Sequence, residues 1–586
     1  MSLNKYVGSQ VDGVSRRGRV ERVTTRVLGN DWGTLTPPAL GSWTPRLPVS
    51  VVLPAHGGQH RLDLALASLA AQTYPDDLIE AVVVDDHSVP ALRLPHTRPA
   101  NTRLVRIPDG GHGAGYARAY GAHASTGEIL LWMDADMIAD PRLVEAQARW
   151  HHVHPECVTL GRVRFAGHTP EDPDTLSGLL RSGTLHRTLD DGRHHAWVER
   201  RLAETDDLRE TDHLGFHAYV GAAAGLRRGL YEIAGGVDPE LDLGQDTEFA
   251  YRLWQAGAVM LPERAATAWH TGPGETFRTR LPSERFRTKV LAELMPHPHT
   301  YRERVPDERR RVPLVHAVVD IAGAPYDLVR GCVDRLLDSA ETDLLITLVA
   351  DWESLTAEDR ELDELGLGLR LIQANYLREP RIAFASATPR TAFPAPFLLE
   401  VPVAWGMGQV ALSRLLAGAE RSRAGLTELF PATTATAGPG VRLWRTRALA
   451  RALRVREEGE DVGEVVSALH GRYRIHAGEE TLTDLSLYRA VPPLPRRSPE
   501  TRTENSGRDQ EARDPFDGFG QADDGGPGGL DHDPPEEEGG AGPDEHGPPR
   551  RTPFLRRLGT WIGECWQRIR EAHGGGRTDG RDPGGR

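Results

Sequence analysis

The stretch Leu130-Leu131-Trp132-Met133-Asp134-Ala135-Asp136 joins a run of large apolar side chains to two carboxylates that are one residue apart. A short apolar run of this kind predicts a buried β-strand, and the carboxylates then follow its carboxyl end. Hard divalent cations prefer oxygen ligands and share one or two protein carboxylates with substrate phosphates. The pair Asp134 and Asp136 is therefore a candidate metal site. Taken alone, such a pair is equally typical of a turn or of a helix N-cap.

Short apolar runs and helical stretches alternate around this strand. The predicted strands are residues 49–54, 79–84, 102–107 and 128–133, and the predicted helices are residues 62–72 and 113–125. This order is typical of a parallel α/β sheet. Ligands of open α/β sheets bind at the carboxyl ends of the strands. Three strands, which end at Pro54, Asp85 and Asp134, therefore deliver polar groups to one edge.

A second acidic pair, Asp85-Asp86, follows the apolar run Val82-Val83-Val84. A buried carboxylate here can accept a hydrogen bond from the imide N–H of uracil or from a ribose hydroxyl. A turn without a binding role is the alternative. The sequence has neither a P-loop nor a GxGxxG fingerprint, which argues against kinases and dehydrogenases.

Several motifs occur together in a fixed order. They are Val49-Ser50-Val51-Val52-Leu53-Pro54-Ala55, Ser68-Leu69-Ala70-Ala71-Gln72-Thr73-Tyr74-Pro75, Val84-Asp85-Asp86-His87-Ser88, Gly113-Ala114-Gly115-Tyr116-Ala117-Arg118, Ser125-Thr126-Gly127-Glu128 and Asp134-Ala135-Asp136. In this order they resemble the family 2 glycosyltransferases. The resemblance implies a GT-A fold over residues 48–300, an α/β, Rossmann-type mixed sheet with flanking helices. It also implies a nucleotide-diphospho-sugar donor held by Pro54, Ala55, Asp85, Asp86, Arg118 and Asp134. For Arg118 the alternative is an ion pair with a surface carboxylate.

The downstream half of the same region is also similar to the family. The similar segments are Val220 to Arg228, Gly235-Gly236-Val237-Asp238, Gly244-Gln245-Asp246-Thr247-Glu248 and Tyr251-Arg252-Leu253-Trp254. The family's catalytic base corresponds to Asp246, and Gln245 stands where the family has Glu. An inverting transfer needs such a base, because the acceptor hydroxyl loses a proton as it attacks. The alternative role of Asp246 is the N-cap of a helix, with Glu248 in the first turn as a partner of the helix dipole.

Residues 247–255 are predicted to form a helix and residues 259–262 a strand. The family places a histidine near the metal or the diphosphate, and His270, which follows this strand, matches that position. The resemblance therefore implies Asp136 and His270 as ligands of Mn²⁺ or Mg²⁺. A structural role for His270 is the alternative, since the chain has 24 histidines.

The resemblance implies a metal-dependent, inverting transfer of a hexose or N-acetylhexosamine to a hydroxyl acceptor on a glycan, a lipid-linked sugar or a cell-envelope polysaccharide. A nucleotidyltransferase is a weaker alternative, because the chain lacks its Gly-rich, basic phosphate loop. The alternative from another class is a catalytically silent scaffold that binds sugar nucleotides.

A second α/β domain is expected over residues 310–490. Its predicted elements are strands 314–320 and 344–351 and helix 326–338. It is either a degenerate second copy of the same fold or an unrelated domain. Asp351-Trp352-Glu353 stands where the acidic pair would be, and the segment from Phe397 to Pro402 has no DxD.

The charge of the chain is unevenly distributed. The net charge is −14, and most of it comes from residues 492–549, which are rich in Pro, Gly, Asp and Glu. Such a composition predicts a disordered acidic linker. The remaining body is nearly neutral, which argues against a nucleic-acid binder. Residues 1–47 form an N-terminal extension without the apolar core of a secretory signal.

Residues 550–572 form a predicted basic amphipathic helix that contains Trp561 and Trp566, and residues 573–586 form a disordered tail. Such a helix suits a membrane surface, and docking on protein is the alternative. The three cysteines, Cys157, Cys332 and Cys565, lie far apart, and no apolar run is long enough to span a bilayer. A cytoplasmic protein, peripheral on the inner face of the plasma membrane, is the expectation.

Overall fold

The computed structural model describes residues 25–211, 213–241, 243–272, 287–296, 310–355, 364–432 and 439–487. These residues belong to one compact unit that contains two large β-sheets. The predicted linker 492–549, helix 550–572 and tail 573–586, and most of the extension 1–47, lie outside the described residues.

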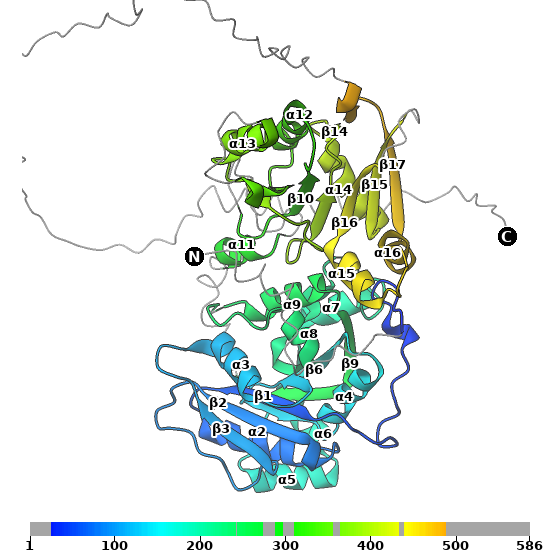
Figure 1. Cartoon of the computed structure of the whole chain (residues 1–586). Helices are drawn as coiled ribbons and strands as arrows, with labels where there is room; N and C mark the ends of the chain where they lie inside the picture. The colour runs from blue at the N-terminus through cyan, green and yellow to red at the C-terminus, as the bar shows by residue number, and fades with distance from the viewer. Residues whose placement is uncertain are drawn as a thin grey trace, which may run out of the picture. The chain divides into compact units, whose positions relative to one another are not determined.

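The first sheet has nine strands in the order β3-β2-β1-β4-β8-β6-β9-β5, with β7 beside β6 (Figure 1). The strands are β1 (Val49–Ala55), β2 (Ile79–Asp85), β3 (Asn101–Arg106), β4 (Ile129–Trp132), β5 (Met137–Ala139), β6 (Cys157–Ala166), β7 (Asp190–His194), β8 (Ala224–Arg227) and β9 (Val259–His270). β1, β2, β3 and β4 run parallel, whereas β8 is antiparallel to both β4 and β6. The sheet is therefore mixed.

Helices cover both faces of this sheet. The helices are α2 (Gln59–Ala70), α3 (Gly113–Ala124), α4 (Leu143–Val153), α5 (Pro173–Ser182), α6 (Leu185–Leu189), α7 (Ala196–Glu204), α8 (Arg228–Ile233) and α9 (Gln245–Gln255). Alternate residues of one strand point to opposite faces. Val52 accordingly packs in the core with Ala117 of α3 and Phe249 of α9, whereas Val51 packs in the core with Leu66 of α2.

The predicted elements around the acidic pairs are confirmed to within a few residues, because each is a compact apolar run or a clear helical pattern. The sequence predicted only residues 259–262 as strand at β9, but β9 continues to His270. The strands β5, β6 and β8 were not predicted.

The second sheet has seven strands in the order β12-β11-β10-β13-β16-β15-β17, and β14 pairs with β18. The strands are β10 (Val315–Asp320), β11 (Leu344–Val349), β12 (Ile382–Ala385), β13 (Phe397–Glu400), β14 (Trp405–Met407), β15 (Leu426–Pro431), β16 (Val441–Arg445), β17 (Arg472–Ala477) and β18 (Leu482–Asp484). Its helices are α12 (Tyr326–Leu337), α13 (Glu364–Tyr376), α14 (Ala411–Ser422), α15 (Thr446–Val455) and α16 (Val462–His470). An α/β domain is thus confirmed for this part of the chain.

The two sheets share their order and their strand directions. β12, β11, β10, β13, β16, β15 and β17 correspond in turn to β3, β2, β1, β4, β8, β6 and β9, with matching parallel and antiparallel pairs. The correspondence extends to individual backbone hydrogen bonds. The amide of Met133 donates to Val52, and the amide of Val401 donates to Val318 at the same point of the second sheet.

Buried arginines of α15 connect the second sheet to elements of the first. Nη1 of Arg447 donates to the carbonyl of Ala258, just after α9, at 2.7 Å, and its guanidinium carbon lies 3.5 Å from the ring centroid of Trp254. Nη2 of Arg451 donates to the carbonyl of Val27 at 2.7 Å. Cations at the carboxyl end of a helix are favourable because the helix dipole is negative there.

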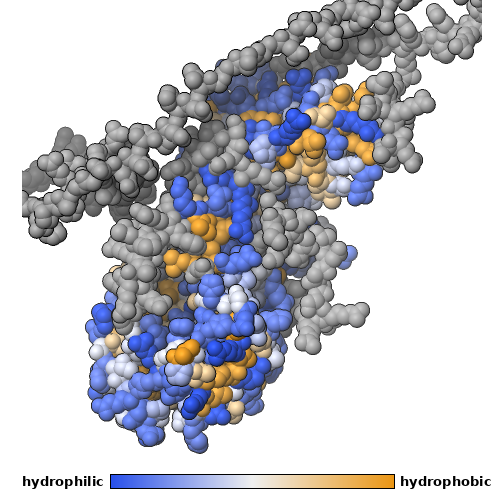
Figure 2. Space-filling model, turned by 90° about the vertical axis from the view of Figure 1, so that its left-hand side faces the viewer, coloured by the Kyte–Doolittle hydropathy of each residue, from blue (hydrophilic) through white to orange (hydrophobic). Residues whose placement is uncertain are grey.

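On the face drawn in Figure 2, hydrophilic residues cover most of the described surface, and hydrophobic residues gather in a few patches. Among the described residues, no helix combines the length and the apolar character needed to cross a membrane.

Candidate functional site

The two carboxylates of the DxD segment lie in the turn that connects β4 to β5. The amide of Met137 donates to the carbonyl of Asp134, and the amide of Ala135 donates to the carbonyl of Pro54. The turn is therefore fixed to the end of β1. Met137 also pairs with His270 in the antiparallel ladder of β5 and β9. This register brings a residue from far along the chain to the acidic turn.

Asp134, Asp136 and His270 form a cluster that can hold a metal ion. One ligand atom from each lies within 4.8 Å of the others. Nε2 of His270 lies 3.4 Å from Oδ1 of Asp136. Nδ1 of His270 lies 3.0 Å from the carbonyl oxygen of Gly272, so an Nδ1–H that donates there leaves the Nε2 lone pair for a ligand. The three predicted metal-site residues do converge.

Asp136 is half-buried, and its surroundings carry both signs of charge. Burial raises the pKa of Asp136, the neighbouring Asp134 adds to the rise, and His270 and Arg61 oppose it. The ion pair with Arg61 is long, at 3.9 Å. A cation between two carboxylates held this close offsets their mutual repulsion, so these ligand atoms fit a hard divalent ion.

Arg118 of α3 is buried and joins two carboxylates of the site. Its Nη2 donates to Oδ1 of Asp134 at 2.7 Å, and its Nη1 donates to Oδ1 of Asp246 at 2.8 Å. Burial lowers the pKa of Arg118, but the charges of Asp246 and Asp134 outweigh this and raise it. The sequence predicted a diphosphate contact or a surface ion pair. Arg118 instead makes an ion pair inside the site, and a donor contact stays a prediction.

Asp246 lies in the first turn of α9 and is held from two sides. Besides the bond from Arg118, its Oδ2 accepts a hydrogen bond from the amide of Gly221 at 3.1 Å. Gly221 has no room for a side chain, since a Cβ there would lie 2.7 Å from Cγ of Asp246. The side chain of Asp246 remains 32% exposed. A carboxylate that is oriented and still open to solvent suits a proton acceptor.

The acidic pair after β2 organises the neighbouring loops. Asp85 is buried, accepts a hydrogen bond from the amide of Ser88 at 2.9 Å and lies 3.6 Å from Arg106. Oδ2 of Asp86 accepts a hydrogen bond from the amide of Gly113 at the start of α3, at 2.8 Å. The amide of Asp86 donates to the carbonyl of Ala55, and the carbonyl of Pro54 binds the DxD turn. The predicted nucleotide residues thus share one edge of the sheet.

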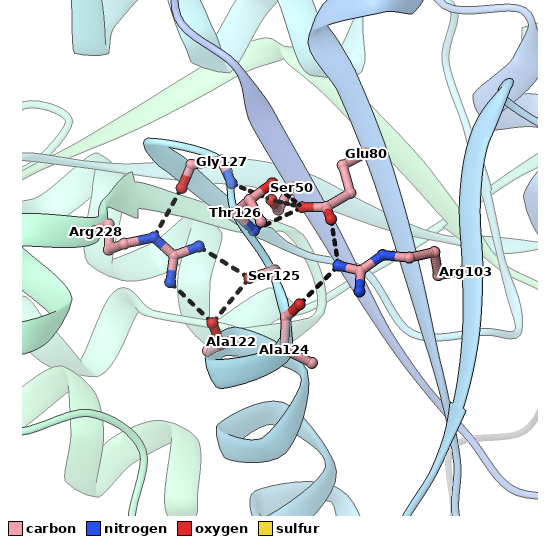
Figure 3. A network of polar contacts seen from close by, with 9 residues as sticks. All are labelled: Ser50, Glu80, Arg103, Ala122, Ala124, Ser125, Thr126, Gly127 and Arg228. Carbon is pink, nitrogen blue, oxygen red and sulfur yellow. Dashed lines mark hydrogen bonds and ion pairs between the residues drawn. The ribbon is translucent and has the colours of Figure 1, made fainter. Parts of the chain in front are cut away.

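A buried polar network holds the carboxyl end of α3, the helix that carries Arg118 (Figure 3). Glu80 accepts hydrogen bonds from the hydroxyl of Ser50, the amide and hydroxyl of Thr126 and the guanidinium of Arg103. Arg103 and Arg228 donate to carbonyls at the end of α3. Arginines at these orphan carbonyls cap the helix and fix its position along the sheet.

Two contributors to the site were not predicted from the sequence. Gly221 belongs to the segment Val220 to Arg228 that resembles the family, but a close approach of its backbone to Asp246 needs the folded chain. Arg61 lies on the first turns of α2 and reaches Asp136 only through the crossing of α2 over the sheet. No local sequence pattern around Gly221 or Arg61 would have selected either residue.

Comparison with known proteins identifies the family of the first domain. A family model described as "Glycosyl transferase family 2" matches residues 50–233. Residues 50–233 are therefore a family 2 glycosyltransferase domain, and the fold class predicted from the sequence is confirmed. The match ends before Asp246 and His270, so it does not test these two residues.

The chain is similar to curated enzymes over more than half of its length. It is 23% identical to the chondroitin synthase of Escherichia coli over 356 residues, which are 58% of this chain and 50% of that enzyme. It is 25% identical to the validoxylamine A glucosyltransferase of Streptomyces hygroscopicus subsp. limoneus over 352 residues, which are 58% of this chain and 71% of that enzyme. The chain thus spans half the length of the bacterial chondroitin synthase.

Among solved structures, the mannosyltransferase PcManGT from Pyrobaculum calidifontis, in complex with GDP-Man and Mn²⁺, covers 45% of this chain and 66% of its own, with 19% identity and a TM-score of 0.27. A superposition this loose says nothing about what this chain binds.

Proposed function

Since residues 50–233 form a family 2 glycosyltransferase domain, we propose that the protein transfers a sugar from a nucleotide-diphosphate donor to a hydroxyl acceptor. The observation that carries this proposal is the convergence of Asp134, Asp136 and His270 beside Asp246, joined through Arg118. A phosphate-binding metal site and a carboxylate base then lie within one continuous network. That is the pair of functions a metal-dependent glycosyl transfer requires.

Asp136 and His270 would hold Mn²⁺ or Mg²⁺, with Asp134 as a neighbour of the metal and the donor. Such an ion, when bound, would neutralise charge on the departing nucleotide diphosphate. Asp85, Asp86, Pro54 and Ala55 would bind the nucleoside at the carboxyl edge of β1 and β2. Support for this arrangement comes from the bonds that connect these loops to the DxD turn.

Asp246 would take the proton from the acceptor hydroxyl as that oxygen attacks the anomeric carbon, on the side opposite the departing diphosphate. This is the inverting course. The bonds from Arg118 and from the amide of Gly221 support the role, because they orient the carboxylate. Gln245 precedes it, so no second carboxylate adjoins Asp246 within the chain.

The test is the thermal stability of the protein with uridine and guanosine diphosphates and their sugar nucleotides, in Mn²⁺ or in EDTA. We expect a metal-dependent rise in Tm with one base, because a ligand that binds only the folded state stabilises it. Asp136→Ala should remove the rise. Asp320→Ala is the matched control, since Asp320 is an exposed carboxylate at the end of β10. No rise with any nucleotide would refute the donor site.

A second measurement, of free nucleotide diphosphate released over time, separates the enzyme from the alternative, a silent scaffold that binds sugar nucleotides. Metal-dependent binding together with release of free nucleotide diphosphate over time supports the transferase. Binding without any turnover, in the presence of saccharide acceptors, supports the scaffold.

We infer that the second domain is a degenerate copy of the first and binds no metal or nucleotide. The support is the shared strand order and the register of the two sheets. In that register Pro402 and Ala404 stand where Asp134 and Asp136 stand, and the turn is closed by the same bond, from Trp405 to Pro402. Nucleotide binding that survives Asp136→Ala would contradict this inference.

The membrane proposal rests on the sequence alone, and it places the protein on the cytoplasmic face of the plasma membrane. Residues 550–572 would bind anionic lipid through their arginines and tryptophans. A chain that ends at residue 549 should no longer co-sediment with anionic vesicles. Undiminished co-sedimentation of that chain would refute the proposal.

A further inference from the structure

The helix that carries Asp246 is buried along most of its length. In α9, every residue from Glu248 to Gln255 is buried. A helix on the surface of a domain keeps a polar stripe in water, so a helix without such a stripe is covered on all its faces. Phe249 and Leu253 pack in the core of the first sheet. The second domain also covers α9, since α15 lies against it (Figure 1).

The carboxyl end of α9 is held by Arg447 of α15. The guanidinium carbon of Arg447 lies 3.5 Å from the ring centroid of Trp254, and Nη1 donates to the carbonyl of Ala258 at 2.7 Å. Nη2 of the same side chain donates to the carbonyl of Gly29 at 3.0 Å, so Arg447 is itself fixed. The ring of Trp254 also meets Gly215, where a Cβ would lie 2.7 Å from Cη2. The indole therefore has little room to shift.

A second segment of the same domain holds the middle of α9. The hydroxyl of Tyr251 donates to the carbonyl of Pro394 at 2.6 Å, and Phe393 packs against the core that contains Tyr251. Just after the helix, Gly257 has a φ of +90°, and a Cβ there would collide with Cγ of Arg451. Contacts from α15 and from the segment before β13 thus act on different points of α9. Together they limit both its shift along its axis and its rotation.

Asp246 lies at the other end of this helix. Trp254 follows Asp246 by eight residues, which is about 12 Å along the helix axis at about 1.5 Å per residue. A movement of the carboxyl end of α9 therefore moves Asp246 relative to Gly221 and Arg118, which bind its carboxylate at 3.1 Å and 2.8 Å. A misplacement of about 1 Å in a reacting group can slow a reaction by about 10²-fold.

We propose that the second domain positions the proposed base, with Arg447 and the carbonyl of Pro394 holding α9 in the place that Asp246 needs. Arg447 acts through α9 and is a positioning residue. The inference rests on the proposed function. It adds a role in the reaction for a domain that we infer to bind neither metal nor nucleotide.

The test measures steady-state release of nucleotide diphosphate from the sugar nucleotide that raises Tm, with water alone and with chondroitin fragments as acceptors. Water, like a sugar hydroxyl, loses a proton as it attacks, so both reactions need the base. Tyr251→Phe keeps the ring and removes the bond to Pro394, and kcat should fall about threefold. Arg447→Met should lower kcat at least about tenfold.

The donor KM and the metal-dependent Tm rise should be the same in these variants as in the unaltered protein, because the donor groups lie on β1, β2 and β4. Arg447→Lys keeps a cation over the ring of Trp254 and a donor for Ala258, so its kcat should stay within about threefold of the unaltered value. A general loss of stability would not separate kcat from KM in this way.

Two variants of the second domain are the controls. Arg423→Met removes a bond to the carbonyl of Glu210, a contact with the first domain that does not involve α9. Leu415→Ala opens a cavity in the core of the second domain, away from α15, and should lower stability. Both should keep the kcat of the unaltered protein. Urea denaturation identifies a temperature at which every assayed variant is folded.

If Tyr251→Phe and Arg447→Met have the kcat of the controls, the second domain does not position the base, while turnover by the unaltered protein keeps the proposed function. A kcat that falls as far in Leu415→Ala as in Arg447→Met also refutes the positioning role, since loss of stability then explains both. If Arg447→Met does not fold, Tyr251→Phe decides. If the unaltered protein binds nucleotide and releases no diphosphate, the proposed function is wrong, and the positioning role fails with it.

Discussion

Nη1 of Arg118 lies 2.8 Å from Oδ1 of Asp246, although the two residues are 128 positions apart in the chain. Arg118 belongs to α3, and Asp246 lies in the first turn of α9. The other end of the same guanidinium holds Asp134. One buried cation therefore sets the position of Asp246, the proposed base, relative to the DxD turn.

Replacement of Arg118 by a neutral residue should destabilise the protein. Arg118→Met should lower the free energy of unfolding by about 3 kcal/mol, at the low end for a broken buried ion pair because both carboxylates keep some contact with water. Urea denaturation measures this change. Arg330→Met removes an exposed ion pair with Asp334 and should have a much smaller effect, since exposed ion pairs contribute little to stability. Equal losses in the two variants would contradict the structural role of Arg118.

Removal of the base should leave donor binding intact. Asp246→Asn should reduce kcat by about 10²–10⁴-fold, the usual contribution of a positioned proton acceptor. The nucleotide-induced rise in Tm should persist, because the donor groups lie on β1, β2 and β4. Asp461→Asn is the matched control, since Asp461 accepts an N-cap bond at the start of α16. An Asp246→Asn variant that keeps its activity would show that another group acts as the base.

A single methyl group should displace the base. In Gly221→Ala the new Cβ would lie 2.7 Å from the carboxyl carbon of Asp246, so that side chain must move. We expect kcat to fall at least tenfold, with little change in nucleotide binding. Gly229→Ala meets no atom within 4 Å and lies in α8, so activity should be unchanged there. Rates for Gly221→Ala that match those of Gly229→Ala would show that Asp246 is not the base.

The contribution of Glu80 should depend on pH. Burial raises the pKa of Glu80, but hydrogen bonds from Ser50, Thr126 and Arg103 outweigh it, and the net pKa is lowered from 4.5. A carboxylate with a depressed folded-state pKa adds stability above its unfolded pKa and loses it as the pH falls through the folded value.

Glu80→Gln should therefore lower the free energy of unfolding by about 1–3 kcal/mol at pH 7. The difference from the unaltered protein should stay constant down to about pH 5 and shrink below 4.5. Chemical denaturation over this pH range measures it. Glu458→Gln, at an exposed position, should show no difference at any pH. If the difference in unfolding free energy between Glu80→Gln and the unaltered protein grows on acidification, the pKa of Glu80 is not lowered and this prediction is wrong.

The edge of the sheet proposed to bind the donor could be predicted from the sequence, because its residues directly follow compact apolar strands. The ends of β1, β2 and β4 carry Pro54, Asp85 and Asp134, and parallel pairing brings such ends together. The match to the family over residues 50–233 agrees with this part.

The contributions of His270 and Arg118 depend on pairing between distant segments, which no local pattern encodes. His270 reaches Asp136 because β9 continues past Pro262 and pairs with β5. The burial of Arg118 likewise follows from α9 packing beside α3, and only the folded chain brings these helices together.

The arginines of α15 have a consequence for how the protein unfolds. Arg447 and Arg451 bind carbonyls at Ala258 and Val27, and Tyr251 of α9 donates to the carbonyl of Pro394. Melting of either sheet would break these contacts and remove their contribution to the stability of the other part. The two sheets should therefore melt in a single cooperative transition in calorimetry. A fragment that ends at residue 300 should be less stable than the whole chain.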